Sequence, residues 1–250
     1  MLVLNAVSTA LGGSPILNNI SFSLEQGQRL SIIGPNGSGK TTLLKTIAGI
    51  LPYEGMITYQ GDPLKQKKAR ELARIFAMLG QKQHLHFNHT VYDLVMMGRF
   101  VHKTGIFHNN AVDKQVVMAM LEVVGLAQYA KSPINTLSGG QAQRVHLATV
   151  LAQEPQVVLL DELTNHLDIK HQVEMVRFLK HWGKEKILIG VFHDVNMALE
   201  LSDNLLVLRA GQIMTHGNKA QVLPRLPEAY DFDIKTFMLK SLKNWEHLRG

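Results

Sequence analysis

Residues 34–41 read Gly34-Pro35-Asn36-Gly37-Ser38-Gly39-Lys40-Thr41, which satisfies the pattern G-x-x-x-x-G-K-[ST]. The aliphatic run Leu30–Ile33 comes immediately before it, and the sequence TLLKTIAGI after it has the spacing of a helix. A glycine-rich loop between a strand and a helix is the setting in which this pattern binds phosphates. The stretch therefore predicts the central strand, loop and helix of an α/β domain.

The residue types in this loop indicate a site for a nucleoside triphosphate. Glycines let the backbone curve around phosphates and turn its N–H groups inward, and the following helix adds its positive N-terminal end. The Lys40 ammonium is expected to reach the β- and γ-phosphates, and the Thr41 hydroxyl to ligate Mg²⁺. The residues expected to contact the nucleotide here are Gly34, Asn36, Gly37, Ser38, Gly39, Lys40, Thr41 and Thr42.

A second motif is the apolar run Val157–Leu160, which ends in the two acids Asp161 and Glu162. Asp161 follows a buried strand, at the edge of a parallel sheet where phosphate-loop enzymes hold magnesium. Glu162, one residue later, is placed to accept a proton from an attacking water molecule. A strand that simply ends in solvated acids is the alternative, and the phosphate loop favours the catalytic interpretation.

The composition limits the classes of protein that fit this chain. It has 250 residues, of which 46% are hydrophobic and 18% charged, so a folded globular chain is expected. Cysteine is absent, which excludes disulfides, thiol nucleophiles and cysteine-bound metals. No apolar run approaches the roughly 18 residues of a membrane span, and the N-terminus lacks a signal-peptide pattern, so we expect a soluble intracellular protein. The net charge of +6 favours an anionic partner.

Strand-like runs alternate with helical segments, which predicts an α/β phosphate-loop NTPase fold with a mostly parallel core sheet, an antiparallel β part and an inserted helical subdomain. We expect one domain over residues 1–250: a nucleotide-binding core in 1–90 and 154–220, a helical subdomain in 91–153 and a C-terminal extension in 221–250. The expected strands are Leu2–Val7, Ile20–Leu24, Leu30–Ile33, Met56–Tyr59, Ile75–Leu79, Val157–Leu160, Ile187–Phe192, Leu205–Leu208 and Ile213–Thr215. The expected helices are Thr41–Ala48, Val91–Gly98, Ala111–Val124, Gln141–Gln153, Ile169–His181 and Val195–Leu201.

Between the phosphate loop and the acidic strand lies the sequence Leu137-Ser138-Gly139-Gly140-Gln141. Together with the motifs around it, this sequence resembles the signature of ATP-binding-cassette (ABC) ATPases. In that family the signature binds the γ-phosphate of ATP held by the opposite subunit, which implies a head-to-tail dimer with two ATP molecules between its subunits. The residues that the resemblance assigns to this second site are Ser138, Gly139, Gly140 and Gln141.

Three further residues match the family in the expected order. Gln81 resembles the residue that reports magnesium and γ-phosphate to the transport partner, and it joins Thr41 and Asp161 as an expected metal ligand. Asp168, in Asn165-His166-Leu167-Asp168, resembles the loop that contacts the dimer partner. His193 resembles the histidine that contacts the γ-phosphate. The resemblance implies that Glu162, His193 and Gln81 are catalytic, with ATP and Mg²⁺ as cofactors.

Two positions depart from the family pattern. Leu163 stands where proline usually follows the acidic strand, but both acids remain, so hydrolysis is still expected. Leu11 stands where the family has an aromatic residue that stacks on adenine. Because leucine has no π face, we expect weaker base stacking at this position.

The stretch from Gln81 to Arg99 resembles the ATPases of metal-chelate importers, which take up siderophores, haem, cobalamin and, in some members, oxyanions such as molybdate. This implies an ATPase at the cytoplasmic face of the inner membrane. Its partners would be two transmembrane permease subunits and, indirectly, a periplasmic binding protein, with no nucleic acid. The histidines His84, His86 and His89 could sense a metal, but a polar docking or solvated loop is favoured.

The choice between an importer and an exporter also stays open, because exporters often, but not always, carry membrane helices in the same chain as the ATPase. Two alternatives to a transporter ATPase remain as well. An ABC ATPase could act in assembly or repair without a transmembrane partner, although the long insertions common in repair proteins are missing from this sequence. A nucleotide-sensing adaptor without hydrolysis is the second alternative, and the presence of Glu162 argues against it.

Overall fold

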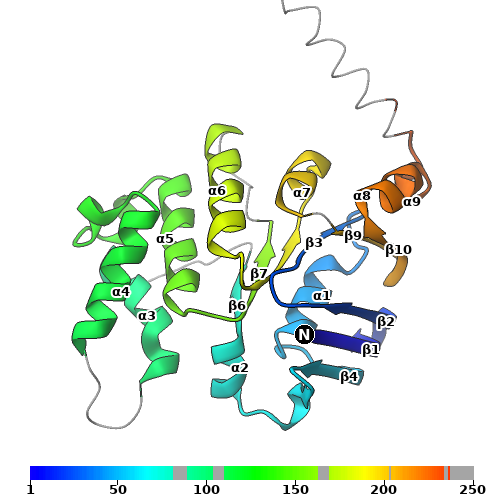
Figure 1. Ribbon diagram of the computed structural model, residues 1–250, viewed down its shortest axis with the longest axis horizontal. Helices are drawn as coiled ribbons and strands as arrows, with labels where there is room; N and C mark the ends of the chain where they lie inside the picture. Colours follow the sequence, from blue (N-terminus) through cyan, green and yellow to red (C-terminus); the bar gives the residue numbers. More distant parts are fainter. Residues whose placement is uncertain (81–88, 104–109, 163–168, 203, 234–235, 237–250) are drawn as a thin grey trace, which may run out of the picture.

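The computed structural model describes residues 1–80, 89–103, 110–162, 169–202, 204–233 and 236. Its strands form two sheets, with helices packed on both sides of the larger one (Figure 1). The strands are β1 Leu2–Leu11, β2 Ser14–Leu24, β3 Arg29–Ile33, β4 Glu54–Tyr59, β5 Asp62–Pro63, β6 Phe76–Leu79, β7 Val157–Asp161, β8 Ile187–Val191, β9 Asn204–Arg209 and β10 Gln212–Asn218. The α-helices are α1 Lys40–Ile47, α2 Ala69–Ile75, α3 Val91–Met97, α4 Asn110–Val123, α5 Gly139–Ala152, α6 Ile169–Trp182, α7 Val195–Leu201, α8 Lys219–Val222 and α9 Leu226–Tyr230.

The larger sheet has the strand order β10-β9-β3-β8-β7-β6. Its strands are parallel except β10, which runs antiparallel to β9. Every residue of β7 and β8 is buried, as expected for central strands covered on both faces. Because parallel strands end at the same edge, the loops that follow β3, β7 and β8 meet there.

Alternate residues of the central strands contribute to two separate hydrophobic clusters. Val158, Leu160 and Leu188 pack in one cluster with residues of α3 to α9, whereas Val157 and Leu159 pack in the other with α1 and the smaller sheet. This alternation follows from the period of two along a strand. The core of the molecule therefore lies on both faces of the large sheet, which holds its strand ends in fixed positions.

The smaller sheet is antiparallel, with the order β2-β1-β4-β5. Its long hairpin turns at Gly12 and Gly13, which have φ values of 56° and 80° and so suit a tight two-residue loop. The register of β1 against β2 shifts near Ala6, where φ is 50°. These irregularities bend the two strands and interrupt the alternation of buried residues, which is why the sequence predicted shorter strands.

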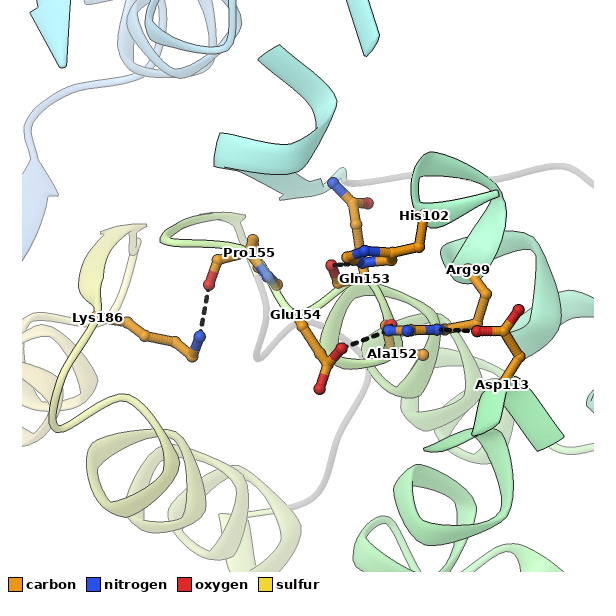
Figure 2. A network of polar contacts seen from close by, with 8 residues as sticks. All are labelled: Arg99, His102, Asp113, Ala152, Gln153, Glu154, Pro155 and Lys186. Carbon is orange, nitrogen blue, oxygen red and sulfur yellow. Dashed lines mark hydrogen bonds and ion pairs between the residues drawn. The ribbon is translucent and has the colours of Figure 1, made fainter. Parts of the chain in front are cut away.

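The helical part comprises α3, α4 and α5 with the 3-10 helices η2 Gly98–His102, η3 Ala127–Tyr129 and η4 Ile134–Thr136, and it lies beside the β6 end of the large sheet (Figure 1). The side chain of Arg99 connects these helices to the turn between α5 and β7 (Figure 2). It donates to Asp113 Oδ1 at 2.9 Å, and to Ala152 O and Glu154 Oε2 at 2.6 Å each. The amide of Gln153, in the same turn, donates to Phe76 O at 2.7 Å. This turn therefore joins the helical part to the sheet.

The fold class predicted from the sequence is confirmed: a largely parallel core sheet, an antiparallel sheet and a set of helices. Helix α2, between η1 Leu64–Gln66 and β6, was not predicted, and Ile75 ends this helix where the sequence suggested that β6 begins. The division into core, helical subdomain and C-terminal extension stays a prediction. In the described part of the chain, no helix is long and apolar enough to cross a membrane.

Candidate nucleotide site

The loop of residues 34–39 connects β3 to α1 at the carboxyl edge of the large sheet. Gly34 has φ 146°, and a Cβ atom there would lie 2.0 Å from the carbonyl oxygen of Leu208 in β9. Gly39 has φ 99°, and a Cβ there would lie 2.9 Å from Leu17 Cδ2. Gly34 therefore requires glycine because a Cβ atom would collide with the backbone of β9. Gly39 favours glycine because side chains rarely adopt its left-handed backbone conformation.

A cavity of about 520 Å³ opens above this loop. Its lining joins residues that lie far apart in the sequence: Ile16, Asn36, Gly37, Ser38, Gly39, Lys40, Thr41, Thr42, Glu162 and His193. Except for Ile16, all of these were predicted as site residues. The cavity thus brings the phosphate loop together with the carboxylate and the imidazole expected to act on a γ-phosphate.

Lys40, the first residue of α1, places its ammonium group inside the loop. Its Nζ donates to the carbonyl oxygens of Gly34 and Pro35, at 2.8 Å each. Burial lowers the pKa of Lys40, and the nearby carboxylates of Glu162 and Asp161 partly offset this. The Oγ of Ser38 is also buried and has no hydrogen-bond partner among the described residues. An orphaned polar atom beside a buried cation fits a loop that receives an anionic ligand.

Thr41 and Asp161 form the pair expected to hold the metal. The Thr41 hydroxyl donates to Asp161 Oδ1 at 3.0 Å, so the first turn of α1 contacts the end of β7. Asp161 is 2% exposed, and burial raises its pKa, while the bond from Thr41 lowers it. A hydroxyl and a carboxylate are oxygen ligands of the kind Mg²⁺ takes when substrate phosphates and water complete its coordination. The donor set therefore fits magnesium.

Glu162 and His193 both line the cavity, and their side chains are in contact. His193 Nε2 lies 2.5 Å from Glu162 Oε1, and the side chains are 43% and 9% exposed, respectively. Glu162 has φ 56°, a left-handed conformation that costs a non-glycine residue roughly 1 kcal/mol or more. Its backbone N–H donates to Val191 O, which anchors this turn to the end of β8. This left-handed conformation ends the extended backbone of β7 at Glu162.

The signature residues lie at the start of α5 and do not line the cavity. Ser138 Oγ accepts from the backbone N–H of Gln141 at 3.3 Å, and Gln141 Oε1 accepts from the N–H of Ser138 at 2.9 Å. Ser138 is exposed, as is Gly139. Within one chain, the signature is therefore a capped helix start open to another molecule.

Several predicted residues cannot be placed. Gln81 and Asp168 lie outside the described residues, as do Leu163, His84 and His86. Their roles stay predictions based on the order of the motifs.

Two neighbours of the loop were not predicted. Ile16, near the start of β2, lines the cavity, whereas Leu11 ends β1 with 40% exposure and is not among the lining residues. The Tyr230 hydroxyl accepts from the backbone N–H of Gly34 at 3.0 Å. No local pattern pointed to Tyr230, because it stands 196 residues from Gly34. Ile16 adjoins Leu17 in an ordinary strand pattern, so its place at the cavity depends on the tertiary fold.

Comparison with known proteins gives consistent results. The sequence model of the family described as ABC transporter matches residues 17–165. An uncharacterized ABC transporter ATP-binding protein of Bacillus subtilis, YvrA, is 38% identical, and the match covers 94% of this chain but 54% of YvrA. The chain thus spans about half the length of that relative. The iron(3+)-hydroxamate import ATP-binding protein FhuC of the same organism is 35% identical, and the match covers 88% of this chain and 85% of FhuC.

The fold is also similar to that of a solved ABC transporter cassette. The dimeric structure of MJ0796, a bacterial ABC transporter cassette, superposes with a TM-score of 0.77 at 25% identity. The match covers 87% of this chain and 98% of that cassette.

Proposed function

The chain belongs to the ABC transporter family and is one of its ATPases, and we propose that it is the subunit whose ATP hydrolysis powers an importer of metal chelates or oxyanions. One observation carries the catalytic part of this proposal: Lys40, Glu162 and His193 line the same cavity as the phosphate loop. The similarity to FhuC, which is named for iron(3+)-hydroxamate import, supports a metal chelate within the proposed class.

The phosphate loop binds and orients the triphosphate. Lys40 exchanges its bonds to the Gly34 and Pro35 carbonyls for bonds to the β- and γ-phosphates, which neutralises charge during transfer. The buried Ser38 hydroxyl supplies a further donor, and backbone N–H groups of the glycine-rich loop are expected to do the same. Ile16 gives an apolar wall beside the loop, against which the nucleoside packs.

Thr41 and Asp161 would hold magnesium at the edge of this loop, since their oxygens already meet at 3.0 Å. When bound, Mg²⁺ would neutralise charge on the phosphate oxygens. The resemblance adds Gln81 as a third ligand. Burial alone raises the pKa of Asp161. A bound cation would lower this pKa again, because a nearby positive charge favours the ionised carboxylate.

Glu162 accepts the proton of the water molecule that attacks the γ-phosphate, and His193 orients that water and contacts the phosphate. The contact between their side chains supports a joint action, because each restricts the rotamers of the other. General-base catalysis of this kind contributes about 10²–10⁴-fold to a rate.

Two copies of the chain bind ATP between them, head to tail. The position of Ser138 and Gly139, exposed and outside the cavity of their own chain, supports this arrangement. The similarity to a dimeric cassette supports it as well. Each signature, with Gly140 and Gln141, then binds the γ-phosphate held by the other copy, and Asp168 contacts the partner.

The transport partner is a pair of permease subunits, with a periplasmic binding protein acting on them from outside, and the ATPase sits at the cytoplasmic face of the inner membrane. A groove of about 310 Å³ supports this docking. It lies along α2 and next to β6, whose end precedes Gln81, and Ile50, Leu72, Ala73 and Met78 contribute to its lining. The relatives, named as transporter or import proteins, favour this function over a soluble assembly or repair ATPase.

The experiment that tests the proposal measures phosphate release from ATP by the purified chain. We expect hydrolysis that requires Mg²⁺ and is lost in Lys40→Ala, with Lys170→Ala, on the exposed face of α6, as the matched control. Uptake of labelled ferric chelates by the chain assembled with its permease then tests the substrate. ATP hydrolysis unaffected by Lys40→Ala would contradict the site, and an assembled complex that transports neither chelates nor oxyanions would contradict the substrate class.

A further inference from the structure

Tyr230 ends helix α9, which packs against β9 through the buried side chains of Leu226 and Ala229. The guanidinium of Arg209, at the end of β9, fixes the same helix. It donates to the carbonyl oxygen of Glu228 and, at 2.6 Å, to Asp231 Oδ2. These contacts hold the end of α9, and with it Tyr230, beside the phosphate loop.

The hydroxyl of Tyr230 meets the loop at Gly34, where β3 ends. It accepts the backbone N–H of Gly34 at 3.0 Å, while the carbonyl oxygen of the same residue accepts Lys40 Nζ at 2.8 Å. The α-carbon of Gly34 presses on Leu208 O, so closely that a Cβ atom would lie at 2.0 Å. Gly34 is therefore held on three sides, and Tyr230 provides the acceptor for its buried N–H.

From this geometry we propose that Tyr230 is a positioning residue for nucleotide binding: its hydroxyl keeps the entry of the phosphate loop in the conformation that receives ATP. Without it, the Gly34 N–H loses its acceptor in a buried place, and the loop gains conformations in which that N–H finds another partner. Only molecules whose loop is in the conformation that receives ATP then bind it. The apparent Kd therefore rises to the intrinsic Kd divided by the fraction of such molecules. No sequence motif explained the segment after β10. Through Tyr230, this segment contributes to the nucleotide site.

Tyr230→Phe tests this inference, because it removes the hydroxyl and keeps the ring that packs on the sheet. The inference depends on the proposed function, so wild-type binding of a fluorescent, non-hydrolysable ATP analogue with Mg²⁺ is measured first. We expect Tyr230→Phe to raise the Kd for this analogue about three- to tenfold, which is the range for one lost hydrogen bond. The KM for ATP should rise by a similar factor, while kcat at saturating ATP stays within about twofold of wild type.

Tyr59→Phe is the matched control. Tyr59 is buried in β4, and its hydroxyl has no hydrogen-bond partner among the residues described. The control should leave the Kd unchanged. If Tyr230→Phe alters only the thermal melting temperature and leaves the Kd and KM at wild-type values, the hydroxyl is merely structural and the inference is wrong. A wild-type chain that fails to bind the analogue would overturn the proposed function itself, and this inference with it.

Discussion

His193 Nε2 lies 2.5 Å from Glu162 Oε1, and both residues line the cavity that the phosphate loop also lines. The two residues follow neighbouring parallel strands, β8 and β7, which is why they meet although 31 positions separate them. Their contact makes the turn after β8 part of the proposed catalytic arrangement, because the imidazole restricts the carboxylate expected to act on water.

Replacing His193 should impair the chemical step more than binding. We expect His193→Ala to lower kcat for ATP hydrolysis by about 10–10²-fold with a smaller change in KM, since the positioning of Glu162 and of the water is lost. Steady-state phosphate release measures both constants. His181→Ala, at the exposed end of α6, is the control and should behave as wild type. Full turnover by His193→Ala would remove this residue from the mechanism.

The buried carboxylate of Asp161 should make the free protein less stable as the pH rises. Burial raises its folded-state pKa, so the folded chain retains this proton at pH values where the unfolded chain has lost it. Stability is then lost as the pH rises from the ordinary value of 3.8 through the raised pKa. Asp161→Asn keeps an acceptor for Thr41 and should abolish this loss of stability with rising pH. The same substitution should also abolish ATP hydrolysis.

Urea unfolding without Mg²⁺ or nucleotide measures this effect. We expect Asp161→Asn to be more stable than wild type at pH 7–8, and the difference to shrink towards pH 4. A difference that stays the same across this range would contradict the assignment of the effect to the Asp161 charge.

The carboxylates of Asp113 and Glu154, which both accept hydrogen bonds from Arg99, should differ in their effect on stability. Arg99 is 5% exposed and Asp113 2%, whereas the Glu154 side chain is 55% exposed. Removing the buried partner leaves a buried charge partly uncompensated, so Asp113→Ala should cost about 3 kcal/mol of unfolding free energy. Glu154→Gln removes an exposed charge and should cost less than about 1 kcal/mol. Equal losses in urea unfolding would contradict this division.

The sequence was sufficient to predict the residues that follow strands in the core. Asp161 follows an apolar run directly, His193 comes at the end of another, and Lys40 follows a third after the glycine-rich loop. Parallel strands bring such positions to one edge of the sheet. Gln81 and Asp168 were assigned only by the order of motifs, and they lie outside the described residues.

Other features could not be predicted because they depend on long-range packing. The contact between Tyr230 and Gly34 and the network around Arg99 join segments with no shared local pattern. Ile16 lines the cavity only because β2 passes beside the phosphate loop. Helix α2 was missed because it is one short element of seven residues with no buried side chain, so its hydrophobic period is weak.

The most direct test of the account is the behaviour of Glu162→Gln with ATP. If Glu162 is the general base and two chains close around ATP, this variant should bind ATP with Mg²⁺ but not hydrolyse it, and it should accumulate as a dimer. Size-exclusion chromatography with light scattering measures the mass. We predict a shift from about 28 kDa to about twice that mass on addition of ATP and Mg²⁺, with no shift for Lys40→Ala in the Glu162→Gln background. Hydrolysis at the wild-type rate by Glu162→Gln, or a monomer at saturating ATP, would contradict the account.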